Sequence, residues 1–347
     1  MKVPVLILFG PTASGKTALL ERLFGGADGD GGVSAEIISA DSMQVYRGMD
    51  IGTAKPTPEE RRNIPHHLID IRNPDEQFNA GEFVRLAEEA CIAVTKRGGL
   101  PVVSGGTGFY LKNLVLGLSE APPSDKEIRS SLREELIERG IVPLIEELVK
   151  VDPVSASRIH INDEYRIIRA LEVYRLTGRP LSAFSSPWNY TGEKKTAVVV
   201  PESPIIFRGD FCFRLVGLQR TRDDLYRRIN ERTAAMFRED LPGEVRKLFE
   251  AGYTPFDPGF RAIGYREFFI ENPRASDVGS YWRLLEDLVG IEALVAQNSR
   301  RYAKRQITFF SSLPAVKWID CGTFEDTVLG LRKVLDDFLF NLHFLQG

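Results

Sequence analysis

The chain has 347 residues, of which 43% are hydrophobic and 27% charged, with a formal net charge of −3. This is the composition of a folded protein large enough for two lobes. The charge excludes a general attraction to nucleic acid or an anionic membrane, so any polyanion site must be a local basic patch. Three widely spaced cysteines, Cys91, Cys212 and Cys321, argue against a zinc ribbon or a disulfide framework. We expect all three to be buried thiols in a reducing cytosol.

The first third of the chain alternates short apolar strands with helical patterns. We expect strands at 4–9, 35–39, 67–71 and 101–104, and helices at 16–24 and 80–97. This order predicts a parallel, three-layer α/β sheet. The glycine-rich stretch 25–32 between the first helix and the second strand predicts a mobile loop.

The middle of the chain, from residue 122 to residue 196, changes to a helical pattern. Helices are expected at 125–139, 142–152 and 162–178, followed by a turn-rich stretch at 185–195. A strand at 211–218 then resumes the sheet, and the helical remainder ends with a strand at 315–320 and an amphipathic helix. We therefore expect a core formed by 1–121 and 197–347, interrupted by a helical insertion at 122–196.

Targeting and membrane signals are not evident in the sequence. The N-terminal apolar run is short and leads directly into a glycine-rich motif, so we expect a core strand and not a signal peptide. No later stretch is long enough to span a bilayer. We expect a cytoplasmic protein, with no membrane partner, that acts as a monomer.

The stretch "GPTASGKT", residues 10 to 17, matches the phosphate-loop pattern G-x-x-x-x-G-K-[ST] between an expected strand and an expected helix. Its glycines allow backbone N–H groups to close around phosphate oxygens, Lys16 neutralises them, and the Thr17 hydroxyl can ligate Mg²⁺. The dipole of the following helix also favours an anion here. The residues expected to hold the phosphate group are Gly10, Thr12, Ala13, Ser14, Gly15, Lys16 and Thr17, with Thr17 as metal ligand. The pattern does not say which phosphate is bound.

Asp41 is the acidic residue most clearly placed to face this loop. It follows the strand at 35–39, and in parallel sheets ligands bind at the carboxyl ends of the strands. An ATPase or GTPase needs an acid at the end of another apolar strand to organise Mg²⁺ and water. The strand at 101–104 runs instead into Ser104, Gly105 and Gly106. A kinase that uses Asp41 to bind its substrate stays open on these residues alone.

Six segments in this order, over almost the whole chain, resemble the tRNA dimethylallyltransferase family, also called tRNA isopentenyltransferase: "GPTASGKT", "ADSMQVYRGMDIGTAKP", "HHLIDI", "GGTGFY", "RAIGYRE" and "AKRQITFF". The resemblance implies transfer of a dimethylallyl group from dimethylallyl diphosphate to the exocyclic amine of the adenine just 3′ of the anticodon. Diphosphate leaves and Mg²⁺ is required. Ser104 stands before "GGTG", where a glycine is often found in the family. The chain lacks the C-terminal Cys/His zinc finger of eukaryotic members, so it looks like the bacterial form.

The chemistry of this reaction suits the residues. An adenine amine is a poor nucleophile, so it needs a carboxylate to accept its proton as the C–N bond forms, and Asp41 is the best-placed acid. Fixed donors and cations around the departing diphosphate lower the barrier. By resemblance, Thr107 and Arg222 contact the diphosphate or its bridging oxygen. The choice of Arg222 among the neighbouring arginines Arg220, Arg227 and Arg228 rests on the resemblance alone.

An adenine in a stacked anticodon loop must be extruded before it can react. The resemblance assigns the flipped base and the tRNA anticodon stem-loop to Asp41, Ser42, Met43, Gln44, Thr107, Arg129, Tyr165, Arg166, Ile167, Ile168 and Arg169. Tyr165 could stack on a base, although Tyr165, Ile168 and Leu171 could also form a core stripe. The basic cluster Arg300, Arg301, Lys304 and Arg305 could track phosphates or form a solvated helix face.

Three other functions stay open at this point. An adenylate isopentenyltransferase acting on free AMP, ADP or ATP would need no helical insertion to grip tRNA. A nucleotide kinase would consume ATP, and the insertion could imitate its lid. An RNA-binding P-loop protein without transferase activity would require neither Asp41 nor Thr107.

Overall fold

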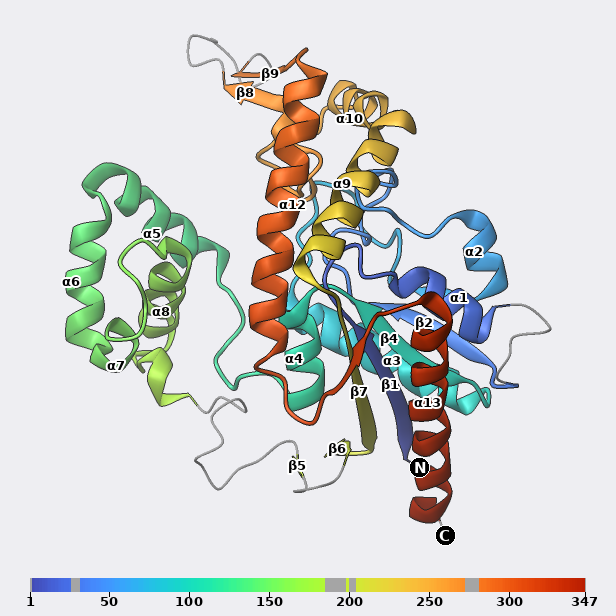
Figure 1. Ribbon diagram of the computed structural model, residues 1–347. Coiled ribbons are helices and arrows are strands. Elements are labelled where there is room, and N and C mark those ends of the chain that lie inside the picture. The colour runs from blue at the N-terminus through green and yellow to red at the C-terminus, as the bar shows by residue number, and fades with distance from the viewer. Residues whose placement is uncertain (1, 26–31, 185–197, 200–203, 272–280, 347) are drawn as a thin grey trace. The chain divides into compact units, whose positions relative to one another are not determined.

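The computed structural model describes residues 2–25, 32–184, 198–199, 204–271 and 281–346 (Figure 1). The chain divides into two compact units, residues 1–115 with 197–347 and residues 116–196. We call them the core unit and the helical unit. The helical unit begins at residue 116, slightly before the expected boundary at 122. Most of the glycine-rich stretch 25–32, and the turn-rich stretch 185–195, lie outside the described residues.

A mostly parallel sheet forms the centre of the core unit. Its strands follow the order β3-β2-β4-β1-β7-β6-β5, and β10 also pairs with β7. The strands are β1 Val3–Phe9, β2 Ala35–Ser39, β3 His66–His67, β4 Leu100–Gly105, β5 Val198–Val199, β6 Ile205–Arg208, β7 Phe211–Gln219 and β10 Lys317–Asp320. Among the described strands of this sheet, only the β5–β6 and β6–β7 pairs are antiparallel. Because β1, β2 and β4 run parallel and side by side, the segments that follow them meet at one edge of the sheet.

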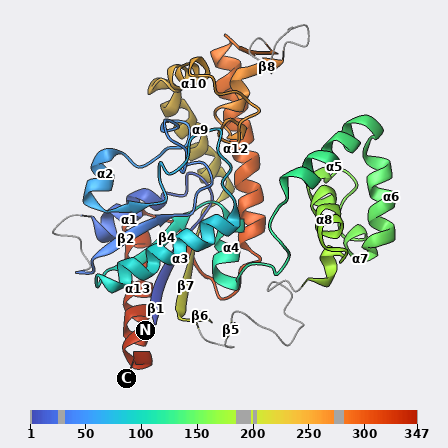
Figure 2. The ribbon, with the colours of Figure 1, turned by 180° about the vertical axis from the view of Figure 1, so that it is seen from behind.

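Helices cover both faces of this sheet, which makes the three layers that the sequence predicts (Figures 1 and 2). The helices of the core unit are α1 Lys16–Phe24, α2 Pro58–Asn63, α3 Ala80–Lys96, α4 Gly108–Leu116, α9 Arg222–Arg238, α10 Leu241–Glu250, α12 Leu288–Phe310 and α13 Phe324–Gln346. On β1, Leu6 and Leu8 pack under α1 and α13, while Ile7 and Phe9, which alternate with them, are equally buried on the other face. This two-sided burial explains why the strand reads as a continuous apolar run.

Two long helices, α9 and α12, pack against each other beyond the sheet (Figures 1 and 2). Together with α10 and the loop that follows β2 they enclose a second apolar cluster, which contains Met49, Leu241, Tyr265 and Val295. A short hairpin of β8 Phe269–Glu271 and β9 Trp282–Leu284, not expected from the sequence, lies beside it. This cluster holds the segment after Asp41 against the helices.

Some expectations were wrong in detail. The strand expected at 67–71 is limited to His66–His67. Leu68 and Asp70 have positive φ angles of 63° and 56°, which a strand cannot accommodate, and the Asp70 carboxylate turns back to bind Lys55 and Arg61. Cys91 and Cys212 are buried as expected, but Cys321 is only partly buried.

The helical unit has its own small core. Its helices are α5 Lys126–Arg139, α6 Ile141–Val151, α7 Pro153–Ala156 and α8 Glu164–Thr177, followed by the short 3-10 turn Leu181–Ala183. Leu132, Leu144, Leu148 and Leu171 are buried between them. Arg175 of α8 forms salt bridges with Glu135 of α5 and Glu147 of α6, and thereby ties the three helices together.

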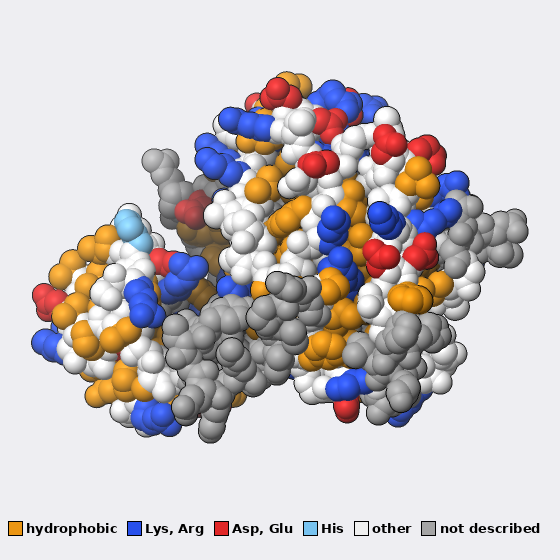
Figure 3. Space-filling view, turned by 60° about the horizontal axis from the view of Figure 1, so that its bottom comes forward, with side chains coloured by type: hydrophobic (Ala, Val, Ile, Leu, Met, Phe, Trp, Pro, Cys, Tyr) orange, Lys and Arg blue, Asp and Glu red, His pale blue; other side chains and the backbone are white. Residues whose placement is uncertain are grey.

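The distribution of charge on the surface and the hydrophobicity of the helices are relevant to possible partners. Acidic and basic side chains are interspersed on the face shown in Figure 3, in keeping with the net charge of −3. Over the described part of the chain, no helix is both long and apolar enough to cross a lipid bilayer.

Candidate active site

The phosphate loop joins β1 to α1, as the sequence predicts. The Lys16 ammonium group lies inside the loop and donates to the carbonyl oxygens of Gly10 at 2.9 Å and Pro11 at 3.1 Å. Burial lowers the pKa of Lys16 to about 8, and the positive charge of Arg232 acts in the same direction, while Asp41 opposes it. Among the described residues no carboxylate pairs with Lys16, so its buried charge favours an anion in the loop.

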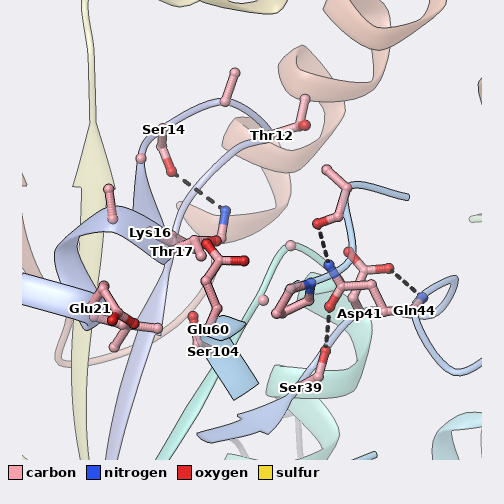
Figure 4. A pocket seen from close by; sticks show the side chains of 18 of the residues that line it. Thr12, Ser14, Lys16, Thr17, Glu21, Ser39, Asp41, Gln44, Glu60 and Ser104 are labelled. Carbon is pink, nitrogen blue, oxygen red and sulfur yellow. Dashed lines mark hydrogen bonds between the residues drawn. The ribbon is translucent and has the colours of Figure 1, made fainter. Parts of the chain in front are cut away.

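A cavity of about 1060 Å³ opens in front of this loop. Figure 4 shows side chains of the loop, among them Ser14, Lys16 and Thr17, together with Asp41 and Gln44 from the segment after β2. Of the residues expected to hold phosphate, the cavity is lined by Thr12, Ala13, Ser14, Gly15, Lys16 and Thr17. Gly10 is buried behind them, where an added Cβ would lie 2.8 Å from the Ser14 hydroxyl and 3.0 Å from Leu218. Its role is therefore in packing and in binding Lys16.

Asp41 stands at the carboxyl end of β2, facing the cavity. Its Oδ1 accepts the Met43 N–H at 2.8 Å and the Gln44 N–H at 3.4 Å, which fixes the carboxylate as part of the turn. Among the described residues none donates to Oδ2. Capping of the turn therefore uses only Oδ1, and Oδ2 is available to a substrate.

Thr107 holds the same turn from the neighbouring strand. Its hydroxyl accepts the Ser42 N–H at 3.0 Å, and its own N–H donates to the Ala40 carbonyl at 3.1 Å. Thr107 lines neither this cavity nor a smaller one between the Asp41 turn and the helices α9 and α12. The structure thus places it as a support of the Asp41 turn, and its predicted contact with the diphosphate stays a prediction.

Gln306 connects the phosphate loop to the turn that carries Thr107. It is buried on α12, accepts the Thr12 N–H at 2.9 Å, and donates to the Gly106 carbonyl at 2.8 Å. No role is expected for Gln306 from the sequence, although it lies in the segment "AKRQITFF". A buried glutamine on an otherwise amphipathic helix is the signal that could have found it.

A second cavity, of about 270 Å³, lies between the Asp41 turn and the helices α9 and α12. Ser42 and Met43 line it, together with apolar residues of α9 and α12 and the basic residues Arg261, Arg266 and Arg305. The two cavities share five lining residues, Thr12, Asp41, Thr53, Arg232 and Tyr302. Asp41 therefore faces both a phosphate-binding space and a separate apolar and basic space.

The arginine that lines both cavities is Arg232, whereas Arg222, chosen from the resemblance, lines neither, so its contact with the diphosphate stays a prediction. Arg222 is the first residue of α9, is exposed, and lays its guanidinium over the Tyr226 ring at 5.1 Å, away from both cavities. Arg232 lies almost three turns further along α9 and lines both cavities. It forms no hydrogen bond or ion pair with any residue that the structure describes. Burial lowers its pKa, and Asp41 opposes that shift.

The donor set suits Mg²⁺ bound chiefly through a substrate phosphate. Thr17 in the first turn of α1 presents a hydroxyl to the cavity that Lys16 and Ser14 also line. Mg²⁺ prefers oxygen ligands, keeps several waters, and is commonly held by phosphate oxygens with one or two protein groups. The described residues contain no cluster of three metal-ligating side chains, so the protein would supply little beyond Thr17.

The helical unit brings several predicted tRNA-contact residues together. The Arg129 guanidinium stacks over the Tyr165 ring at 4.7 Å, and Tyr165 is 66% exposed. Arg166 is exposed and pairs with Asp163. Arg169 is paired with the buried Glu172, which also accepts the Asp125 N–H at the start of α5.

Two residues predicted to contact tRNA are core residues. Ile167 is 1% exposed and Ile168 is 5% exposed, because both point into the apolar centre of the helical unit. Their side chains are not available to a ligand. The alternative reading of this stripe as core is correct for Ile168 and Leu171 but wrong for Tyr165.

Fold and site together define a P-loop α/β protein in which one carboxylate faces two adjoining cavities, one in front of the phosphate loop and one beside α9 and α12. A family model described as IPP transferase matches residues 44–313, and the chain belongs to this family. The tRNA dimethylallyltransferase of Geobacter sulfurreducens is 43% identical over 327 residues, which cover 94% of this chain and 95% of the relative. That of Geobacillus thermodenitrificans is 40% identical and covers 96% of each chain.

Solved structures agree with this assignment. The full-length tRNA isopentenylpyrophosphate transferase of Bacillus halodurans is 34% identical, covers 99% of both chains and superposes with a TM-score of 0.62. A eukaryotic dimethylallyltransferase acting on tRNA is 25% identical, with a TM-score of 0.69, over 97% of this chain and 80% of the other. The resemblance identified from the sequence and the predicted fold class are both confirmed.

Proposed function

We propose that the protein transfers the dimethylallyl group of dimethylallyl diphosphate to the exocyclic N6 of the adenine immediately 3′ of the anticodon in tRNA. The observation that supports this most strongly is the junction of the two cavities. Asp41 and Arg232 line both the space in front of the phosphate loop and the space between α9 and α12. A donor diphosphate on the loop and an adenine in the smaller cavity would meet at that carboxylate.

The reaction exchanges one bond for another. The N6 lone pair of adenine forms a bond to the allylic carbon, the bond from that carbon to the diphosphate oxygen breaks, and diphosphate leaves with the electron pair. The N6 proton passes to Asp41, whose Oδ2 is available while the turn holds Oδ1. Because the carboxylate is fixed by backbone N–H groups, little reorganisation is needed as the proton moves.

The departing diphosphate gathers negative charge, which the loop is built to receive. The backbone N–H groups of the loop, Lys16 and the guanidinium of Arg232 surround the space it would fill. Mg²⁺ held by Thr17 would add further positive charge at the phosphate oxygens. Such groups accelerate the reaction because they interact more strongly with the developing diphosphate than with the bound donor.

The acceptor adenine would reach Asp41 through the smaller cavity. Met43 and other apolar side chains line its walls, and Arg261, Arg266 and Arg305 supply cations for the phosphates of neighbouring nucleotides. Extrusion of the base from the anticodon loop costs a few kcal/mol. Contacts of the helical unit through Arg129, Tyr165 and Arg166 would help to offset that cost. We expect a cytoplasmic monomer.

Mass spectrometry of nucleosides tests the proposal. Unmodified tRNA is incubated with the protein, Mg²⁺ and dimethylallyl diphosphate, and parallel samples contain AMP or ATP in place of tRNA. We expect a dimethylallyl mass on adenosine from tRNA alone. Product only in the nucleotide samples would assign the chain to adenylate isopentenyl transfer, and no product with any acceptor would contradict the proposal.

A further inference from the structure

Two arginines bind the backbone of the phosphate loop itself. The Arg228 Nε donates to the carbonyl oxygen of Ala13 at 2.9 Å, and the Arg220 Nε donates to that of Ser14 at 2.9 Å. The terminal nitrogens of both guanidinium groups lie 3.6 Å from the position that a Cβ would take on Gly15. The carbonyl oxygens of two consecutive loop residues, Ala13 and Ser14, therefore each accept a hydrogen bond from an arginine side chain.

The loop needs such support because its backbone is unusual. Ala13 has a φ angle of 63° and Gly15 one of 99°, both in the left-handed region. Glycine adopts this region freely, whereas in alanine the Cβ approaches the carbonyl oxygen. When successive residues alternate in this way, their N–H groups converge into a concave anion site. The hydrogen bond from Arg228 to the Ala13 carbonyl oxygen stabilises a backbone conformation that is unfavourable for alanine.

Helix α9 is well anchored for this purpose. Leu225 and Ile229, on the same face of α9, are buried, and the Ala13 methyl group packs against their cluster. Arg220 just before the helix is fixed by Asp224 at 2.8 Å and by the Cys321 carbonyl at 3.3 Å. The helix thus holds Ala13 both through its side chain and through its carbonyl oxygen.

We propose that Arg228, assisted by Arg220, is a positioning residue that holds the phosphate loop in its binding conformation before the diphosphate arrives. This deepens the proposed function, since the ligand of the loop is taken to be the donor diphosphate. Arg228 also lines the larger cavity, so a direct contact with the diphosphate is the competing role. The two roles differ in how the effect of losing Arg228 depends on residue 13.

A double-mutant cycle separates them, with inorganic pyrophosphate and Mg²⁺ as ligand and calorimetry as readout. Arg228→Met should weaken pyrophosphate binding about tenfold, the size of the left-handed penalty of an alanine. In an Ala13→Gly background the same change should cost less than about threefold, because glycine adopts the loop conformation unaided. Arg238→Met, at the exposed end of the same helix, is the matched control and should change nothing.

Equal losses in both backgrounds would overturn the proposal and favour direct contact or a long-range charge effect. Arg228→Lys gives a second test: full recovery of binding would mean that charge alone matters, and partial recovery is expected if the directed Nε bond matters. Because Ala13→Gly alone should keep or tighten binding, the proposal remains falsifiable even if Arg228→Met fails to fold.

The cycle also distinguishes this inference from the function it rests on. If pyrophosphate binding follows the expected pattern but no dimethylallyl group reaches tRNA, only the proposed function fails. If the wild-type protein modifies tRNA but the two substitutions act independently, only the positioning role of Arg228 fails.

Discussion

The two oxygens of Asp41 have different surroundings, and this division defines what the residue can do. Oδ1 is held by backbone N–H groups, so a substitution that keeps these bonds should preserve the turn. Asp41→Asn retains the shape and an acceptor oxygen but cannot take the N6 proton. We expect kcat to fall by about 10²- to 10³-fold, within the range for loss of a general base.

Donor affinity should be nearly unaffected by Asp41→Asn, because the loop residues that would bind diphosphate are unchanged. Steady-state kinetics with tRNA, combined with calorimetry of pyrophosphate binding, separates the two effects. Asp223→Asn, at an exposed position in the first turn of α9, is a suitable control. Unchanged turnover in the Asp41 variant would remove this carboxylate from the mechanism.

The lowered pKa of Lys16 predicts that donor binding in the absence of tRNA depends on pH. Its pKa is lowered to about 8, chiefly by burial, so the ammonium group is charged below that pH and neutral above it. A bound diphosphate would favour the charged form and raise the pKa. The dissociation constant for dimethylallyl diphosphate should therefore stay flat below pH 8 and rise by about tenfold per pH unit above it.

Binding measured from pH 7 to pH 10, above the last ionisation of the diphosphate at about pH 6, tests this expectation. Lys16→Arg serves as the comparison, because a guanidinium stays charged throughout this range. That variant should bind with a flat profile, whatever its absolute affinity. A flat profile for the wild-type protein would show that the charge of Lys16 does not govern donor affinity.

At the scale of elements, the segment between β2 and α2 depends on one carboxylate of α10. Glu244 accepts the N–H groups of Asp50, Ile51 and Gly52 at 2.9, 2.8 and 3.2 Å, and the Tyr265 hydroxyl at 2.6 Å. Burial and this carboxylate raise the pKa of Tyr265 well above its usual value, so the hydroxyl remains a donor. The segment that begins at Asp41 is thereby tied to the helices that wall the acceptor cavity.

Glu244→Gln should loosen this segment without touching the phosphate loop. We expect a loss of about 2 kcal/mol in the free energy of unfolding, as for a charge-assisted hydrogen bond replaced by weaker ones. The kcat/KM for tRNA should fall, while pyrophosphate affinity should stay within about twofold of wild type, as expected for distant sites. Tyr265→Phe, which removes a single bond, should show a smaller loss in thermal unfolding. Equal losses in tRNA and pyrophosphate binding would contradict this localised role.

Element-level patterns made most of the core predictable. The apolar runs at β1, β2 and β4 and the phosphate-loop motif each depend on local sequence, and they placed Asp41 opposite Lys16 correctly. Arg232 could not be singled out from the sequence, because it shares α9 with Arg222 and only the packing of α9 against α12 decides which of its residues face the cavities. The loops at 68–71 likewise depend on distant partners, since Asp70 turns towards Lys55 and Arg61.

At the scale of the whole molecule, the residues expected to act in the reaction are distributed over two units. The phosphate loop, Asp41 and both cavities belong to the core unit, whereas Arg129, Tyr165 and Arg166 belong to the helical unit. A change confined to the helical unit should therefore alter the use of tRNA and leave the donor site intact. Arg166 is the most suitable position, because its side chain is 71% exposed and its only partner is the nearby Asp163 in the described part of the chain.

Arg166→Ala should raise the KM for tRNA with little effect on kcat or on pyrophosphate affinity. If Arg166 contacts a phosphate, the variant releases fewer counterions on binding, and the slope of log affinity against log salt should decrease by about 0.7 to 1. Arg139→Ala, exposed at the end of α5, is the control for a general charge effect and should change the slope less. Titration of tRNA at several salt concentrations measures both slopes, and equal slopes for wild type and the Arg166 variant would place this arginine outside the tRNA interface.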